Sequence, residues 1–198
     1  MFIKNLREEK EAVVIFTGAG ISAESGISTF RDSNGLWENH DIKEICNELT
    51  YLKNLELVNK FYSDRREQLN IVKPNETHYA IKRIQDKLEG IIDVYIITQN
   101  VDDLLERAGC TDVLHVHGDL TQMTCLTCNS NFDIGYNRYT KDTNCPHCNK
   151  TGNARPNIVF FYGQAPMYKY MNQAFDKLRQ KKLQYQNRLL RRIELEIM

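Results

Sequence analysis

The chain has 198 residues, 41% of them hydrophobic and 26% charged, a composition that excludes a disordered protein and suits one core with or without a small appended module. Lys and Arg number 26, as do Asp and Glu, so the overall charge gives no sign of a nucleic-acid or membrane surface. The charges are uneven along the chain, because residues 167–198 carry 8 basic against 3 acidic residues and residues 1–166 carry 18 against 23.

The N-terminus and the cysteines bear on the cellular compartment. No stretch approaches the roughly 18 consecutive apolar residues of a membrane span, and residues 4–11 carry charges of both signs before a short apolar run, which does not match a signal peptide. We therefore expect a cytoplasmic protein that binds no membrane. In a reducing compartment the six cysteines are expected to be metal ligands or single thiols rather than disulfides.

The order of apolar runs predicts strands that alternate with helices. Residues 12–17 form a continuous apolar run that leads into a glycine turn, which is typical of a buried parallel strand. Residues 51–70 have a helical pattern, and a second helix opens at Pro74 and Asn75. Three further buried strands are expected, at residues 91–98, 113–117 and 157–162. This order predicts an α/β fold with a doubly wound, Rossmann-like parallel sheet.

Residues 121–153 lack this periodicity and carry two C-x2-C pairs that are separated by 16 residues. Two such pairs present four thiolates to one tetrahedral Zn²⁺ and leave no position for water, so an inserted zinc-ribbon module with one structural zinc is predicted. The ligands are Cys125, Cys128, Cys145 and Cys148. Two redox pairs are the disfavoured alternative. His147 is expected to be a bystander, and Cys46 and Cys110 to be small apolar residues.

A glycine turn directly follows the first strand. Gly18 and Gly20 let the backbone approach a pyrophosphate closely, and the next helix would offer its N-terminal donors. The following glycine is Gly26, so the spacing is not G-x-G-x-x-G, and a plain tight turn is an equal alternative on these residues alone.

Several motifs in order resemble those of the sirtuin family. Three runs are similar to the sirtuin signatures, namely residues 18–37, 99–102 and 115–118. The four cysteines then stand where that family keeps its zinc, and residues 155–159 resemble the segment after it. The resemblance extends over about residues 12–166. Within the family, Ser-Thr-Phe-Arg at 28–31 is similar to the bacterial deacylase branch.

The resemblance implies that NAD binds along the first two motifs. Asn100 can hydrogen-bond a ribose or an ordered water, and Asp102 can accept from the nicotinamide amide, although a turn former and a helix cap fit these residue types equally well. Phe30 would shield the reactive ribose carbon, and Arg31 would meet a phosphate or ribose. The implied cofactor-binding residues are Gly18, Ala19, Gly20, Ile21, Ser22, Ser25, Gly26, Phe30, Arg31, Gly35, Leu36, Trp37, Gln99, Asn100, Val101 and Asp102.

His117 is implied to be the catalytic general base. An imidazole that titrates near neutral pH can accept a proton from a ribose hydroxyl. Its place after a buried strand, at the carboxyl edge where such sheets bind ligands, favours this role over that of a core histidine. His115 lies two residues earlier on the same strand face, so the spacing does not separate the two. Only the family's His-Gly pair selects His117.

Tyr62 and Arg65 are implied to bind the substrate's acyl group. They lie three residues apart on a predicted helix, so they share a face. A phenol and a guanidinium can together hold a carboxylate, although a solvated helix face is the ordinary alternative. In the family, Tyr-x-x-Arg at this place marks sirtuins that remove succinyl and malonyl as well as acetyl groups.

The resemblance implies an NAD-dependent protein-lysine deacylase that releases nicotinamide and O-acyl-ADP-ribose. Its partners would be acylated lysine side chains of proteins, with the peptide bound as an extended strand. The expected organisation is an incomplete Rossmann-like domain at 1–120 and 154–166, the zinc module at 121–153, and a non-family helical tail at 167–198.

The end of the chain departs from the sirtuin pattern. Sirtuins continue into a Gly-Thr-Ser turn and a further strand that hold the adenosine, whereas the last glycine here is Gly163. Gln164 also replaces the usual Glu after an extra aromatic residue. We expect a C-terminally truncated or frame-shifted sirtuin that lacks the last strands, binds NAD weakly and has a poorly anchored tail. The alternatives are a catalytically impaired fragment that binds zinc but turns over little or no NAD, and a zinc-ribbon interaction module that binds nucleic acid or protein, which the acidity of residues 1–166 disfavours.

Overall fold

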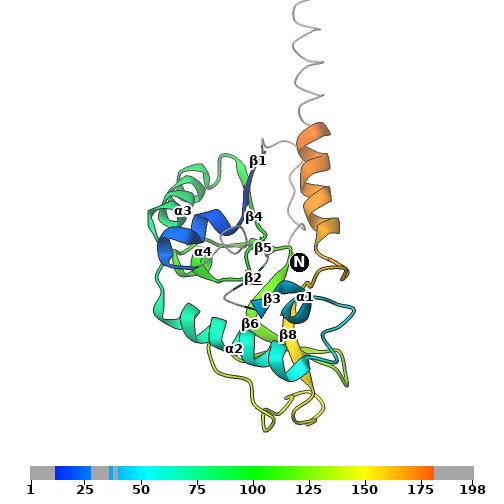
Figure 1. The fold of residues 1–198 in the computed structure, drawn as a ribbon. Helices are drawn as coiled ribbons and strands as arrows, with labels where there is room; N and C mark the ends of the chain where they lie inside the picture. The colour runs from blue at the N-terminus through cyan, green and yellow to red at the C-terminus, as the bar shows by residue number, and fades with distance from the viewer. Residues whose placement is uncertain (1–11, 28–35, 38–39, 181–198) are drawn as a thin grey trace, which may run out of the picture.

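The computed structural model describes residues 12–27, 36–37 and 40–180. A three-stranded parallel sheet in the order β1-β4-β5 lies at its centre (Figure 1). Its strands are β1 (Ala12–Thr17), β4 (Asp93–Thr98) and β5 (Val113–His115). They are rich in Val and Ile, as is typical of parallel strands. The expected burial of residues 12–17 is wrong, because β1 lies at an edge of the sheet and only Thr17 of it is buried. The predicted Rossmann-like parallel sheet is confirmed, with these three strands inside their expected ranges.

One face of this sheet is covered by η1 (Ala19–Ser25), α3 (Glu76–Leu88) and α4 (Leu104–Arg107), as Figure 1 shows. Ile96 of β4 is fully buried on this side, in one cluster with Ile81, Leu105 and Cys110. α3 begins after Asn75, whose side-chain oxygen accepts from the Thr77 N–H at 2.9 Å. The predicted helix start is therefore confirmed, and Cys110 is a buried thiol of the core.

Residues 168–180 form a helix on the opposite face of the parallel sheet (Figure 1). Ala174 is 2% exposed in a cluster with the sheet residues Ile97 and Leu114 and with Val116, which follows β5. The rings of Phe16 and Phe175 meet edge to face, with their centroids 6.1 Å apart. The helical prediction is confirmed over this range. The expectation of a poorly anchored tail is wrong here, because the apolar face of the sheet needs this cover; residues 181–198 lie outside the described part.

A second sheet is antiparallel, in the order β7-β6-β8. It consists of β6 (Gly118–Cys125), β7 (Asn131–Asp133) and β8 (Ala154–Ile158). The prediction of a strand at 157–162 in the parallel sheet is therefore wrong. The strand ends at Ile158, pairs with β6, and is followed by a single bridge from Phe161 to Asn47. Its apolar residues are buried against α2 instead of between parallel strands.

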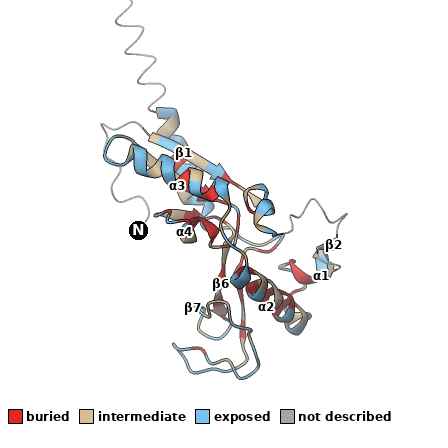
Figure 2. Ribbon diagram, turned by 90° about the vertical axis from the view of Figure 1, so that its left-hand side faces the viewer, coloured by how far each residue is buried: buried red, intermediate tan, exposed pale blue. Residues whose placement is uncertain are grey.

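α2 (Leu55–Ile71) packs on this second sheet, beside α1 (Ile42–Ile45) and the short pair β2 (Leu36–Trp37) and β3 (His40–Asp41). Figure 2 marks buried residues in red near α3 and α4 and again along α1 and α2. Arg66 is fully buried, and its guanidinium donates to the carbonyls of Asn137 at 3.1 Å and Leu120 at 3.2 Å. Burial lowers the pKa of Arg66 to about 10, so it still carries its charge at neutral pH.

None of the helices in the described ranges has the length and apolar character needed to cross a membrane.

Candidate functional site

A cavity of about 550 Å³ opens where the strands of the parallel sheet end. Ala19 follows β1, Asn100 follows β4 and His117 follows β5, and all three line the cavity. Cys46, Tyr62 and Phe160 line it from the second region of the molecule. Parallel α/β sheets bind their ligands at this carboxyl edge, so the strand ends gather the predicted site residues in one place.

The glycine turn after β1 leads into η1, a seven-residue 3-10 helix. Gly18 is closely packed, because a Cβ there would lie 3.2 Å from Oε1 of Gln99. The turn is held by Asn75, whose side-chain nitrogen donates to the Ile21 carbonyl at 2.8 Å and to the Ser25 hydroxyl at 3.0 Å. The expected cofactor segment from Gly18 to Gly26 is thus held by these hydrogen bonds beside the cavity, which Ala19 lines.

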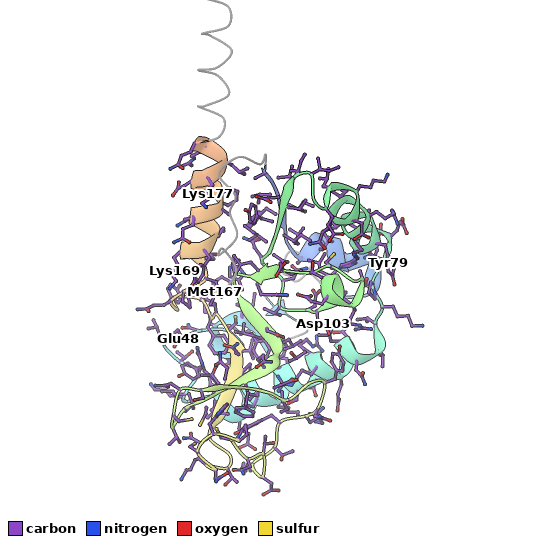
Figure 3. The ribbon with its side chains drawn as sticks, turned by 180° about the vertical axis from the view of Figure 1, so that it is seen from behind. Glu48, Tyr79, Asp103, Met167, Lys169 and Lys177 are labelled. Atoms are coloured by element: carbon purple, nitrogen blue, oxygen red, sulfur yellow. The ribbon has the colours of Figure 1, made fainter. Side chains whose placement is uncertain are left out.

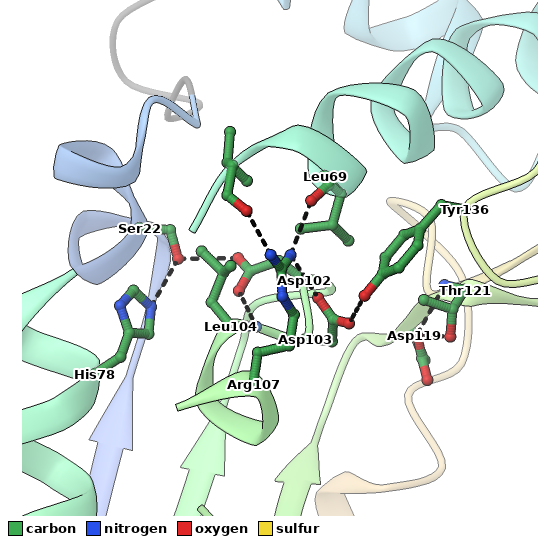
Figure 4. Close-up of polar contacts among 11 residues, drawn as sticks. Ser22, Leu69, His78, Asp102, Asp103, Leu104, Arg107, Asp119, Thr121 and Tyr136 are labelled. Atoms are coloured by element: carbon green, nitrogen blue, oxygen red, sulfur yellow. Dashed lines mark hydrogen bonds and ion pairs between the residues drawn. The ribbon is translucent and has the colours of Figure 1, made fainter. Parts of the chain in front are cut away.

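Ser22 is the centre of a buried polar network next to the cavity (Figure 4). Its hydroxyl donates to Oδ2 of Asp102 at 2.9 Å and accepts from the Asn100 amide at 3.0 Å, and Nε2 of His78 lies 3.5 Å away. Asp102 also accepts from the backbone N–H of Leu104 at the start of α4. Burial raises the pKa of Asp102, and these two hydrogen bonds lower it in part. Asp102 therefore has two roles, because it accepts a hydrogen bond at the start of α4 and also lines the cavity.

The carboxylate beside it, Asp103, links three parts of the chain (Figure 4). It accepts from the Tyr136 hydroxyl near β7 and lies 3.7 Å from the guanidinium of Arg107. Arg107 in turn donates to the carbonyls of Leu69 and Val72 at the end of α2. These contacts fix the loop after β4, and hence Asn100 and Asp102, relative to the second region.

Hydrogen bonds distinguish the two histidines that the spacing could not separate. Nδ1 of His115 lies 2.8 Å from the Asn100 carbonyl and Nε2 lies 2.8 Å from the Glu106 carboxylate. Burial lowers the pKa of His115, but the bond and the charge of Glu106 outweigh this and raise it to about 9. Both ring nitrogens therefore donate at neutral pH, and His115 has no lone pair left to accept a proton.

His117 has the geometry of a base. Its Nδ1 lies 3.0 Å from the Gln99 carbonyl, which can only accept, so Nδ1 carries the proton. In the neutral ring Nε2 is then the acceptor, and His117 lines the cavity. The ring is held in one tautomer by a backbone atom, an arrangement that suits proton transfer.

Tyr62 and Arg65 have different surroundings in the structure. Tyr62 is 1% exposed, lines the cavity and stacks with Phe160 at 6.0 Å between ring centroids. Burial raises the pKa of its hydroxyl, and the neighbouring Cys46 raises it further. The guanidinium of Arg65 lies over the ring of Phe61, 5.2 Å from its centroid.

Part of the expected cofactor loop is not described. Phe30, Arg31 and Gly35 lie outside the described residues, and Leu36 and Trp37 form β2.

The four predicted zinc ligands converge, with all four sulfur atoms within 4.8 Å of one another. Cys125 and Cys148 are 3.7 Å apart, and Cys128 and Cys145 are 3.8 Å apart. Four sulfurs at 2.3 Å from a tetrahedral zinc are about 3.8 Å apart, so the residues fit the metal. Each hairpin has an Asn in the left-handed region, at positions 129 and 149 with φ of 56° and 57°. His147 turns to the Asn131 carbonyl, as expected of a bystander.

A model of the Sir2 family matches residues 18–184 of the chain. The chain belongs to the Sir2 family. The NAD-dependent protein deacylase of Campylobacter jejuni is 49% identical over 156 residues, which are 79% of this chain and 65% of that protein. A mutant Sir2 homologue solved with ADP-ribose has a TM-score of 0.71 at 35% identity, covering 86% of this chain and 66% of that one. Sir2 bound to acetylated peptide has a TM-score of 0.61 at 28% identity, covering 87% and 65%.

The chain spans about two thirds of the length of these relatives. The Sir2 family match extends to residue 184, past the limit near 166 that the motifs indicated. Ten of the residues that line the cavity of this Sir2 chain were not predicted as site residues, among them Cys46, Phe160 and Tyr168. Cys46 and Phe160 carry no motif, and only their burial beside Tyr62 brings them to the site. Tyr168 lies in the segment that was expected to be foreign to the family.

Proposed function

We propose that the chain is an NAD-dependent protein-lysine deacylase, with acetyl-, succinyl- and malonyl-lysine as its substrates. The observation that carries this proposal concerns His117. The Gln99 carbonyl accepts from its Nδ1, which leaves Nε2 as the acceptor, and the ring lines a cavity together with Asn100 and Asp102. Family membership, the deacylase name of a relative, and the ADP-ribose and acetylated-peptide complexes of similar structures support the cofactor and substrate class.

The residues of the cavity suit NAD. Glycines that let the backbone come close, a side-chain amide and a carboxylate stand together at the carboxyl edge of the sheet. When bound, NAD supplies the ribose carbon that takes the acyl oxygen, and it leaves as nicotinamide and O-acyl-ADP-ribose. Ser22 orients Asn100 and Asp102 toward this site by its two hydrogen bonds. His117 accepts a proton from a ribose hydroxyl at Nε2, while the Gln99 carbonyl stabilises the charged ring.

The four cysteines would hold one Zn²⁺ with a structural role. All four positions of a tetrahedral ion are filled by thiolates, so none is left for a water or a substrate. The zinc therefore shapes the loop between β6 and β8 and takes no part in the reaction.

Replacing His117 by Ala tests the proposed base. Loss of general base catalysis should lower nicotinamide release with an acetyl-lysine peptide by about 100- to 10,000-fold. Zinc content, measured by metal analysis, should stay at one ion per chain, because the base and the metal lie at separate places. His115→Ala is the matched comparison; if it abolished the reaction while His117→Ala did not, the assignment of the base would be reversed.

Replacing Arg65 by Met tests the acyl-group preference. A bound succinyl carboxylate would lose its cationic partner, at a cost of about 2–5 kcal/mol for a desolvated charge pair. We expect kcat/KM to fall selectively for succinyl-lysine peptides and to change little for acetyl-lysine peptides, which have no carboxylate. Lys60→Met removes an exposed cation from the same helix and should affect neither substrate. Equal losses on both substrates would contradict the proposed role and indicate a structural one.

A further inference from the structure

The first residue of the 168–180 helix contacts the proposed base. The hydroxyl of Tyr168 lies 2.8 Å from Nε2 of His117, and the two rings are 5.8 Å apart between centroids. Tyr168 lines the same cavity as His117. Figure 3 shows the start of this helix, marked by Met167 and Lys169, beside the segment that carries Glu48. The helix that covers the sheet therefore begins at the mouth of the site.

The direction of this hydrogen bond follows from the other ring nitrogen. Nδ1 of His117 donates to the Gln99 carbonyl, so Nε2 of the neutral ring is an acceptor and the Tyr168 hydroxyl donates to it. A ring nitrogen has a single lone pair in the ring plane. While Tyr168 fills it, His117 cannot accept a proton from any other hydroxyl.

We propose that Tyr168 is a positioning residue that masks His117 until a bound ligand displaces it. This inference rests on the proposed function, because it concerns the base of that reaction. A rotation of the side chain is enough to open the mask, since Tyr168 is 37% exposed in the first turn of its helix. The helix itself is held elsewhere, through Ala174 on the sheet and through the Tyr168 N–H, which donates to the Ala165 carbonyl. The hydroxyl that leaves Nε2 can then bond to water.

Chemical labelling tests the mask without any need for enzyme activity. Diethyl pyrocarbonate acylates an unprotonated histidine nitrogen, and peptide mass mapping locates the product. Tyr168→Phe keeps the ring and removes only the hydroxyl. We expect His117 to be labelled about two- to tenfold faster in this variant, the range of one neutral hydrogen bond. Tyr79→Phe, an exposed tyrosine of α3, should leave the rate unchanged.

Two internal references keep this result interpretable. His147 lies away from the cavity and should react at the same rate in every variant, and the fully buried His78 should stay protected. Protected His78 together with an unchanged rate at His117 would overturn the mask. A faster labelling rate at all histidines would indicate that Tyr168→Phe has lost its fold. Tyr168→Trp, which fills the same space without a hydroxyl, would then be labelled in its place, and the labelling rate of His117 in that variant would decide.

Nicotinamide release from NAD and an acetyl-lysine peptide completes the test. If Tyr168 masks the base, Tyr168→Phe should raise kcat/KM by about two- to tenfold. A fall in kcat/KM despite faster labelling would mean that the hydroxyl assists the reaction, and it would overturn the mask. Faster labelling with no release from either protein would support the mask and reject the proposed function instead.

Discussion

Removal of zinc is expected to unfold the segment between β6 and β8. The binding energy of a structural zinc is folding energy, about 10–16 kcal/mol in small zinc modules, and it rivals the total stability of an ordinary domain, about 5–15 kcal/mol. The apolar cluster of this module is small, and two of its five buried residues, Cys125 and Cys145, are themselves ligands. Without the metal, the two hairpins that carry the cysteines lose the link that joins them.

The loss should also spread to α2. Arg66 donates to the carbonyls of Leu120 and Asn137, so an unfolded module would leave a buried guanidinium without these partners. Hydrogen exchange after chelation should therefore show lost protection in residues 118–158 and in α2, while β1 and α3 keep theirs. Cys145→Ser should reproduce this pattern, and Cys110→Ser, at a buried cysteine outside the cluster, should retain zinc. Reduced, folded protein that contains no zinc would refute the claim.

Replacing Gly118 by Ala should have the second large effect. Gly118 has φ of +91°, and an added Cβ would lie 2.0 Å from the Asn157 carbonyl oxygen, so both its backbone and its surroundings require glycine. Strain of this backbone region and overpacking each cost about 1–3 kcal/mol, which together give a destabilisation of about 2–6 kcal/mol. The register of β6 on β8 begins at this residue, next to His117. Nicotinamide release should therefore fall together with stability.

Urea unfolding measures this effect, and two other glycines separate its causes. Gly135 also has positive φ, at +59°, but open space around it, so Gly135→Ala should show the backbone cost alone. Gly20→Ala meets nothing within 4 Å and should change stability least. If Gly118→Ala were no more destabilising than Gly135→Ala, the close approach of Asn157 would not matter.

The sequence predicted those parts of the molecule whose structure depends on residues that are close together in the chain. The apolar run from Ala12 to Phe16 before the glycine turn was enough to predict a parallel strand, but not its burial, because β1 lies at an edge of the sheet and Val13 and Phe16 are exposed. The spacing within each C-x2-C hairpin brings its two thiols close together, and the four cysteines converge as predicted. Asn75 also capped α3 as its residue type indicates.

The remaining features depend on partners that are distant in sequence. The composition of the run 157–162 does not say against what it packs: Ile158 and Phe160 are buried in the cluster that α2 covers, whereas Phe161 and Tyr162 are exposed. His115 and His117 look alike on one strand until Glu106 and Gln99 are seen beside them. The helix at 168–180 was predicted as a helix, whereas its docking on β4 and β5 needed the sheet to be assembled first.

The helix at 168–180 makes two contacts in different parts of the molecule. Ala174 holds it on the apolar face of the sheet, and Tyr168 at its start occupies the base. On the proposed mask, the state with a free His117 is favoured by whatever loosens this helix, and the same loosening exposes apolar surface. Substitutions along the helix would therefore move accessibility of the base and resistance to aggregation in opposite directions.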